Sequence, residues 1–212
     1  MKITKLGHCC LLIEEQGLRI LTDPGSYTVE EQKSLNNLDV ILITHEHQDH
    51  LHIESLKVIF GNNPNVILFT NKGVAKILDS EGIKYELLEH NQSKTINGVL
   101  FEGFGEVHAE IYRTRPIIIN TSYFISNRFF YPGDALYNPQ KPVEILALPV
   151  AGPWLKLSEA IDYAREVKPK ICFPVHEGMI KTPGTIYRLP NEILTSEGIQ
   201  FTVIEPGNSS DF

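Results

Sequence analysis

The feature that most constrains this chain is a strand pattern that runs directly into a cluster of histidines and carboxylates. Residues 39–44 are dominated by a continuous apolar run, which is typical of a strand buried on both faces. The next six residues, 45–50, contain three histidines and two carboxylates. Imidazole nitrogen and carboxylate oxygen are ligands that a divalent ion such as Zn²⁺ takes. The sequence therefore predicts a metal site in the loop that follows this strand.

The spacing within this loop allows it to bind two ions. Because the loop is not helical, His45 and His47 can turn to one ion while Asp49 and His50 turn to another. An isolated His-x-His segment is more often a solvated histidine-rich loop or an adventitious metal-binding tract. The rest of the chain must decide between these interpretations.

Short strand and helix patterns fill the remainder of the chain. Strand patterns cover residues 3–6, 9–14, 18–22, 66–70, 94–104, 117–131, 144–149 and 171–175. Helical patterns cover 53–60, 72–78 and 157–167, with a last helix near 190–196. Two β-rich halves with two helices each predict a fold of the α/β (α+β) class, an αββα sandwich. No linker or low-complexity tract interrupts the chain, so we expect a single domain over residues 1–212.

Charge and cysteine content limit the classes of partner and the cellular compartment that we expect for this chain. Nineteen basic against 26 acidic residues give a net charge of −7, which disfavours a general nucleic-acid binder. Three cysteines without a Cys-x-x-Cys pair do not make a disulfide framework, which favours a reducing cytoplasm. The first residues lack the apolar core of a signal peptide, and no apolar run approaches twenty residues. We therefore expect a cytoplasmic chain that does not span a membrane.

The His-x-His-x-Asp-His spacing of residues 45–50 resembles the hallmark of the metallo-β-lactamase-fold hydrolases. Further motifs follow in that family's order, so the resemblance covers essentially the whole chain. The opening residues 7–10 and the segments 148–153 and 158–160 are similar to small stand-alone hydrolases near the ascorbate-6-phosphate lactonase branch. The resemblance implies a metallo-β-lactamase-like fold.

The resemblance also implies a binuclear metal centre. His108 stands where the family has the third histidine of one site, Asp134 where it has the bridging carboxylate, and His176 where it has the last ligand of the second site. Asp23 corresponds to a strand-end aspartate that orients the metal loop by hydrogen bonding. The implied ligands are His45, His47, Asp49, His50, His108, Asp134 and His176. They would hold two divalent ions. Zinc is the expected metal, and manganese and iron are alternatives.

The implied activity is hydrolysis by a hydroxide that bridges the two ions, with an ester, lactone or phosphodiester bond in a small substrate as its target. Asp49 is expected to take the proton of the attacking water, and His8 is an alternative to solvent as leaving-group acid. Arg115 and Lys181 follow ligand motifs in expected loops, and we predict that they bind an anionic group of the substrate. The alternatives are a metal-dependent nuclease, disfavoured by the net charge, and a non-catalytic metal-binding module. The substrate, the native metal and the oligomeric state stay open.

Overall fold

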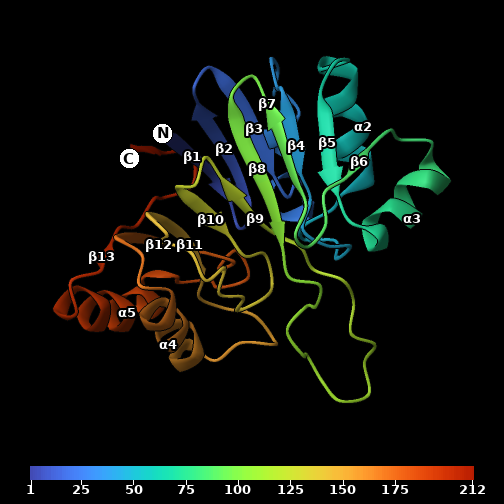
Figure 1. Cartoon of the computed structure of the whole chain (residues 1–212). Helices are drawn as coiled ribbons and strands as arrows, with labels where there is room; N and C mark the ends of the chain where they lie inside the picture. Colours follow the sequence, from blue (N-terminus) through green and yellow to red (C-terminus); the bar gives the residue numbers. More distant parts are fainter.

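Two sheets of seven strands each are stacked face to face in the computed structural model, which describes residues 1–212 (Figure 1). The first sheet has the order β14 (Ser209–Asp211), β1 (Lys2–Gly7), β2 (Cys10–Glu15), β3 (Leu18–Thr22), β4 (Val40–Leu42), β5 (Ile67–Thr70) and β6 (Glu86–Leu87). The second has the order β13 (Gln200–Phe201), β12 (Ile171–Val175), β11 (Ile145–Pro149), β10 (Phe129–Tyr131), β9 (Ser122–Ile125), β8 (Val99–Phe104) and β7 (Ser93–Ile96). Each sheet is antiparallel at one end of its strand order and parallel at the other.

Helices cover the outer face of each sheet. The helices are α1 (Val29–Gln32), which follows the short 3₁₀ turn η1 (Ser26–Thr28), α2 (Ile53–Asn62), α3 (Lys72–Glu81), α4 (Leu157–Val167) and α5 (Gly184–Ser196). In Figure 1, α2 and α3 lie beside the first sheet, whereas α4 and α5 lie beside the second. No helix has both the length and the apolar composition that a membrane span requires. The predicted αββα sandwich is confirmed.

Three apolar clusters hold these layers together. The central one, of 21 buried residues, joins the facing sheets through side chains such as Ile3, Ile13, Phe101, Phe129 and Phe173. A second cluster lies between the first sheet and the helices α2 and α3, and a third lies between the second sheet and α4 and α5. Because burial of apolar area is the dominant favourable term in folding, these three layers fix the positions of the strand ends.

The structure differs from the predicted elements at several places. Only Ser122–Ile125 and Phe129–Tyr131 of the predicted 117–131 strand pair are β-structure, because residues 117–121 lack a ladder partner. Helix α5 begins at Gly184 rather than near 190, and Pro190 lies buried inside it, so packing overrides the local preference of proline. Strand β14 is polar and has no apolar alternation, yet it pairs with β1 through the register Ile3 to Ser210.

A buried ion pair joins the two sheets near their carboxyl edge. Lys5 lies in β1, and Glu177 follows β12 by two residues. The Lys5 ammonium donates to the Glu177 carboxylate and to the Pro174 carbonyl oxygen at 2.7 Å, and the Tyr187 hydroxyl donates to Glu177 Oε1 at 3.1 Å. The Lys5 side chain is completely buried and that of Glu177 almost so. The pair therefore ties β1 of the first sheet to the carboxyl end of β12 in the second.

Replacement of Lys5 by Met should lower the free energy of unfolding by about 3–5 kcal/mol, because it leaves the Glu177 carboxylate buried without a counter-ion. The double variant Lys5→Met/Glu177→Leu should recover most of that loss. Urea unfolding measures both values, with Lys2→Met as the control, since Lys2 pairs with Glu14 at the surface. A Lys5→Met variant no less stable than Lys2→Met would contradict the importance of this pair.

Candidate metal centre

The predicted ligand residues lie together at one edge of the sandwich. His45 to His50 follow β4, His108 follows β8, Asp134 follows β10 and His176 follows β12. Strands β8 and β10 are both antiparallel to β9, and β10 runs parallel to β11, which runs parallel to β12. Their carboxyl ends therefore point to the same edge of the second sheet. The carboxyl end of β4 contributes the remaining ligand residues from the first sheet.

The carboxylate of Asp134 lies at the middle of this cluster and is 2% exposed. Its Oδ2 atom lies 2.9 Å from His176 Nε2, 3.4 Å from His108 Nε2 and 3.8 Å from His45 Nε2. Its Oδ1 atom lies 3.1 Å from His50 Nε2. One carboxylate thus faces four imidazoles that come from three different loops.

The ligand atoms around Asp134 divide into two groups. The nitrogens of His45, His47 and His108 and an oxygen of Asp134 all lie within 4.8 Å of one another. On the other side, His50 and His176 form a second group of the same size with His8 and Cys9. The Asp49 Oδ2 atom also faces this second group, at 3.5 Å from His176 Nε2 and 3.8 Å from His50 Nε2. Asp134 therefore lies between two sets of donors.

Hydrogen bonds determine which nitrogen of His50 faces the cluster. The Asp23 carboxylate accepts from His50 Nδ1–H at 2.7 Å, so in a neutral His50 the bare nitrogen is Nε2. That nitrogen faces the Asp134 Oδ1 atom, which is also an acceptor. Two acceptors 3.1 Å apart repel each other unless a cation lies beside both. The arrangement therefore requires a positive charge, either a proton or a metal ion.

The same argument orients His45 and His108. The Thr44 hydroxyl donates its proton to Asp23 Oδ2 at 2.7 Å, so it accepts at 3.0 Å from His45 Nδ1–H. His108 Nδ1–H donates to the Ala109 carbonyl oxygen at 2.5 Å. In both residues the bare Nε2 atom is left to face Asp134. Partners that hold the outer ring nitrogen in this way are usual for histidines that bind metals.

The donor set fits divalent metal ions. Five buried polar atoms of the predicted ligand residues have no hydrogen-bond partner, namely His50 Nε2, His108 Nε2, Asp134 Oδ1 and both ring nitrogens of His176. Buried polar atoms are rarely left unpaired, so a group of them aimed at one point needs an explanation. Imidazole nitrogens and carboxylate oxygens are the ligands of zinc, manganese and iron sites. Divalent ions held by the two donor groups would provide partners for the three Nε2 atoms and for Asp134 Oδ1.

The pKa shifts of the cluster also indicate that it requires positive charge. Burial favours neutral His50, but the carboxylates of Asp134 and Asp23 outweigh it and raise the pKa of His50 well above 6.5. Burial also opposes ionisation of Asp134, yet His50, His176 and His45 hold its pKa well below the usual value. Burial lowers the pKa of His45, which favours the neutral form that binds metals.

His8 and Asp49 form a hydrogen-bonded pair at the edge of the second group. The Gly178 N–H donates to His8 Nδ1 at 3.0 Å, so the ring proton is on Nε2 and donates to Asp49 Oδ2 at 3.1 Å. Burial lowers the pKa of His8 to about 4. Burial raises the pKa of Asp49, but the hydrogen bond from His8 and the charge of His50 outweigh it and bring the value to about 2. The Asp49 carboxylate is thus ionised and, at 23% exposure, reachable by water.

The two predicted substrate-binding cations lie in different surroundings. Arg115 is exposed and lines a cavity together with His47 and His108. Lys181 is exposed in the segment between His176 and α5, and it lines none of the cavities at this edge. The structure therefore brings Arg115, but not Lys181, into one cavity with predicted metal ligands.

Sequence reasoning missed several residues that contact the cluster. The Nε1–H group of Trp154 donates to Asp134 Oδ2 at 2.8 Å, and the Tyr131 hydroxyl donates to Asp23 Oδ2 at 2.5 Å. Cys9 packs in the central apolar cluster and also lies beside His8, His50 and His176. A signal for Trp154 was present, because the only tryptophan of the chain directly follows the 148–153 motif.

Three residues at this edge have an unusual backbone conformation. Asp23, His8 and His176 have φ values of +36°, +49° and +67°, in the left-handed region that non-glycine residues rarely adopt. Gly133 has φ +62°, and a Cβ atom there would lie 2.8 Å from Thr44 Cβ. This glycine therefore allows the Asp134 loop to pack directly against the loop that carries the histidines.

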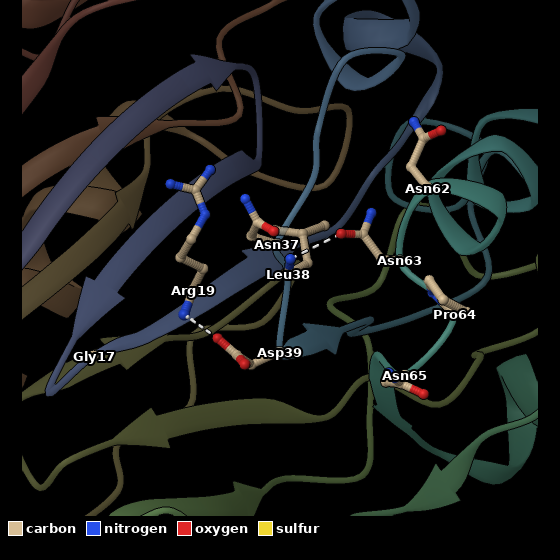
Figure 2. Close-up of a pocket in the computed structure, with 9 residues that line it drawn as sticks. All are labelled: Gly17, Arg19, Asn37, Leu38, Asp39, Asn62, Asn63, Pro64 and Asn65. Atoms are coloured by element: carbon tan, nitrogen blue, oxygen red, sulfur yellow. Dashed lines mark hydrogen bonds between the residues drawn. The ribbon is translucent and has the colours of Figure 1, made fainter.

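A larger cavity lies at the opposite end of the first sheet and has a different character (Figure 2). It measures about 430 Å³ and is lined by Gly17, Arg19, Asn37, Leu38, Asp39, Asn62, Asn63, Pro64 and Asn65. Two of its polar side chains bond to the backbone, since Asn63 Oδ1 accepts from Leu38 N–H and Asp39 Oδ2 from Arg19 N–H, each at 2.8 Å. No histidine lines it, so the metal centre remains the candidate functional site.

Comparison with known proteins identifies the family to which this chain belongs. A family model described as the beta-lactamase superfamily domain matches residues 2–176. Protein Rv0786c of Mycobacterium tuberculosis is 33% identical over 204 residues, 93% of this chain and 94% of that one. A UPF0173 metal-dependent hydrolase of Carboxydothermus hydrogenoformans is 26% identical over 83% of this chain and 84% of its own. Igni18, a metallo hydrolase from Ignicoccus hospitalis, has a TM-score of 0.76 at 18% identity and covers 100% and 98% of the two chains.

Replacement of Asp23 by Asn should lower the zinc affinity of the protein about 10- to 100-fold, because an amide NH₂ opposes the donors that now orient His50 and Thr44. The free energy of unfolding of the metal-free protein should fall by about 2–3 kcal/mol, since buried donors lose their acceptor. Chelator competition and urea unfolding measure the two effects. Asp39→Asn at the far end of the sheet is the control, and equal zinc affinity in both variants would contradict the orienting role of Asp23.

Proposed function

Because this chain belongs to the β-lactamase superfamily and is a metal-dependent hydrolase, we propose that it holds two divalent cations and cleaves an ester, lactone or phosphodiester bond in a small anionic substrate. One ion would be held by His45, His47 and His108, and the other by Asp49, His50 and His176. Asp134 would be shared between them. Zinc is the proposed metal, with manganese and iron as alternatives, because metal availability as well as ligand type decides occupancy.

The position of Asp134 is the observation that carries this proposal. Its two oxygens face different histidine groups, with Oδ1 toward His50 and Oδ2 toward His108 and His176. A carboxylate in this position can keep two cations close together, because it screens their mutual repulsion with a full negative charge. A single ion would leave several of the convergent buried acceptors without a partner.

The protein residues have separate tasks in the proposed reaction. Divalent ions bound here would supply Lewis acidity, which lowers the pKa of a water molecule and polarises the oxygen of the scissile bond. The Asp49 carboxylate is the proposed proton acceptor for the attacking water, since it is ionised and partly exposed. Trp154 holds Asp134 in place through its Nε1–H group and, with the buried histidines, limits the access of bulk water.

For His8 we propose a positioning role rather than the expected role as leaving-group acid. Its Nδ1 atom is occupied by the Gly178 N–H, and its Nε2 proton is already donated to Asp49. The ring is 3% exposed and stacks on Tyr27, with 4.5 Å between ring centroids. His8 thereby holds one oxygen of Asp49 and leaves the other for the reaction. Solvent is the proposed source of the proton for the leaving group.

Arg115 and Lys181 remain the proposed anion-binding side chains. Arg115 lines the same small cavity as His47 and His108, which supports its role, because an anionic group beside Arg115 would lie close to the proposed metal site. Support for Lys181 is its exposure in the loop that follows His176. The substrate is proposed to be a small molecule rather than a nucleic acid, since the chain carries a net charge of −7.

We further propose that residues 1–212 act as one domain in the cytoplasm. Both sheets contribute ligand residues, and β14 near the end of the chain completes the sheet that begins with β1. All three cysteines are free and buried, which is consistent with a reducing compartment.

Metal analysis followed by hydrolysis of a panel of phosphodiesters, lactones and esters tests the proposed function. We expect about two metal ions per chain, and loss of one ion with most of the activity in Asp134→Asn, because an amide lacks the charge that holds two cations together. Asp162→Asn on the surface of α4 is the control. Full activity of metal-free protein, or both ions and normal rates in Asp134→Asn, would contradict the proposal.

Conservative replacement tests the role of His8. His8→Gln retains a donor that can reach Asp49 and should bind the second metal ion within a few-fold of the wild type. His8→Ala removes the donor and should weaken that ion about 10- to 100-fold. Stepwise zinc titration measures both. If His8→Gln keeps both ions but loses as much activity as His8→Ala, His8 transfers a proton and the positioning role is wrong.

A further inference from the structure

Exposed apolar side chains gather in the loops around the metal centre. Nine large hydrophobic side chains of the whole chain are exposed. Six of them lie in segments that contain or contact predicted ligand residues, namely Tyr27, Val107, Ile111, Tyr112, Ile117 and Met179. Exposed apolar side chains scattered over a surface need no explanation, whereas a group of them around one site indicates a binding surface.

Four of the six lie in residues 105–121, which we call the site loop. This loop joins β8 to β9, has no regular secondary structure and projects from the sandwich in yellow-green (Figure 1). Its base is tied to the metal centre, because His108 N–H donates to the Ile118 carbonyl oxygen at 3.0 Å and Ala109 N–H to that of Asp134 at 2.8 Å. The site loop therefore begins and ends at the metal centre.

A cavity connects the apolar side chains of the site loop to the proposed metal ligands. This cavity is small, about 20 Å³, and its lining includes His47, His108, Ile111, Arg115 and Ile117. Ile117 is 60% exposed and Ile111 38%, so both still have apolar surface to bury against a ligand. If the polar group of a molecule lies at the metal centre, the adjoining part of that molecule would contact the apolar side chains of Ile111 and Ile117.

Tyr27 and Met179 form an apolar edge on the other side of the centre. The Tyr27 ring stacks on His8, and Met179 follows Gly178, whose N–H donates to His8 Nδ1. Tyr27, His8 and Gly178 also line a cavity of about 270 Å³. The polar ligand cluster is thus bordered on two sides by apolar surface.

The charges of the site loop distinguish a single molecule from a membrane surface. Glu106 and Glu110 balance Arg113 and Arg115, so the loop has no net positive charge outside its histidine, and the whole chain is acidic. Attraction to an anionic bilayer needs an excess of basic residues near the surface. The observations therefore favour a single amphiphilic molecule, whose anionic group can meet Arg115 beside the metal centre.

We propose that the substrate of this hydrolase is an amphiphile whose alkyl or acyl chain packs against Ile111 and Ile117 of the site loop while its polar group reaches the metal centre. This inference rests on the proposed function, because it assigns the substrate class of the same site. Burial of methylene groups against these side chains would supply affinity that the small polar cluster cannot supply alone.

Binding of n-alkylphosphonates to the zinc-loaded and the metal-free protein tests the proposal. Butyl-, hexyl- and octylphosphonate share one anionic head and contain no bond of the proposed kinds to hydrolyse. Fluorescence of Trp154, the only tryptophan, reports binding because its indole lies beside Asp134 and His108. We expect the Kd to fall about tenfold from butyl to octyl on the zinc-loaded protein, since each added methylene is buried on one side. The same trend should persist, at weaker overall affinity, without zinc.

The double variant Ile111→Ser/Ile117→Ser should lose most of this dependence on chain length. The control Leu189→Ser removes a side chain that is 47% exposed on α5 and should keep it. Arg115→Glu should weaken all three phosphonates by a similar factor, because it acts on the head group. Equal Kd values for the three ligands, or an unchanged dependence in the double variant, would overturn the proposal.

Two further measurements separate this proposal from its alternatives. Protein that binds zinc and hydrolyses the panel, yet shows no chain-length dependence, overturns the amphiphilic substrate and leaves the proposed function standing. Protein that binds no metal but keeps the dependence overturns the proposed function alone. The second measurement is sedimentation with phosphatidylglycerol vesicles, which detects binding of the protein to a bilayer. Vesicle binding that is lost in the double variant, without a chain-length effect in the phosphonate series, would replace the substrate by a bilayer surface.

Discussion

Four hydrogen bonds converge on the buried carboxylate of Asp23, and the arrangement of the metal centre depends on them. The donors are the amide and hydroxyl of Thr44, the Nδ1–H of His50 and the hydroxyl of Tyr131. Asp23 follows β3 in the first sheet, whereas Tyr131 ends β10 in the second. One charged group thus joins the sheets, orients the loop after β4 and, through Thr44, orients His45. Hydrogen bonds to a buried carboxylate are strong, because ion and donor are both removed from water.

The same carboxylate explains why the centre requires cations. Asp23 accepts hydrogen bonds from His50 Nδ1–H and from the Thr44 hydroxyl, which in turn accepts from His45 Nδ1–H. The Nε2 atoms of His50 and His45 are therefore left bare and face Asp134. Burial of carboxylates costs several kcal/mol for each charge, and the cost is offset only when opposite charge lies close by. Raised pKa of His50 and lowered pKa of Asp134 are the response of the protein alone. A divalent ion would supply the required positive charge with twice the charge of a proton, and it can bind several ligand atoms at once.

Rigid and variable parts of the molecule have different roles around this centre. The ligand residues follow strand ends that three apolar clusters hold in place, so their positions tolerate little movement. The site loop has no regular structure and exposes apolar side chains beside the ligands. Enzymes commonly place specificity on such loops and chemistry on the scaffold. The proposed hydrolysis and the proposed choice of an amphiphilic substrate are therefore separable properties of this fold.

What the sequence by itself determined are the features carried by local patterns. The alternation of strand and helix patterns predicted the αββα sandwich, and the apolar run before His45 with the spacing of the histidine loop predicted a metal site. The resemblance to the metallo-β-lactamase-fold hydrolases added His108, Asp134 and His176 as expected ligands. Tertiary structure alone decided the partners. Tyr131 reaches Asp23 across 108 positions, and Gly178 reaches His8 across 170, so no local pattern could reveal them. Strand β14 and the start of α5 also depend on packing against distant segments. Local propensity acts over a few residues, whereas the protonation and orientation of a side chain depend on whatever the fold places beside it.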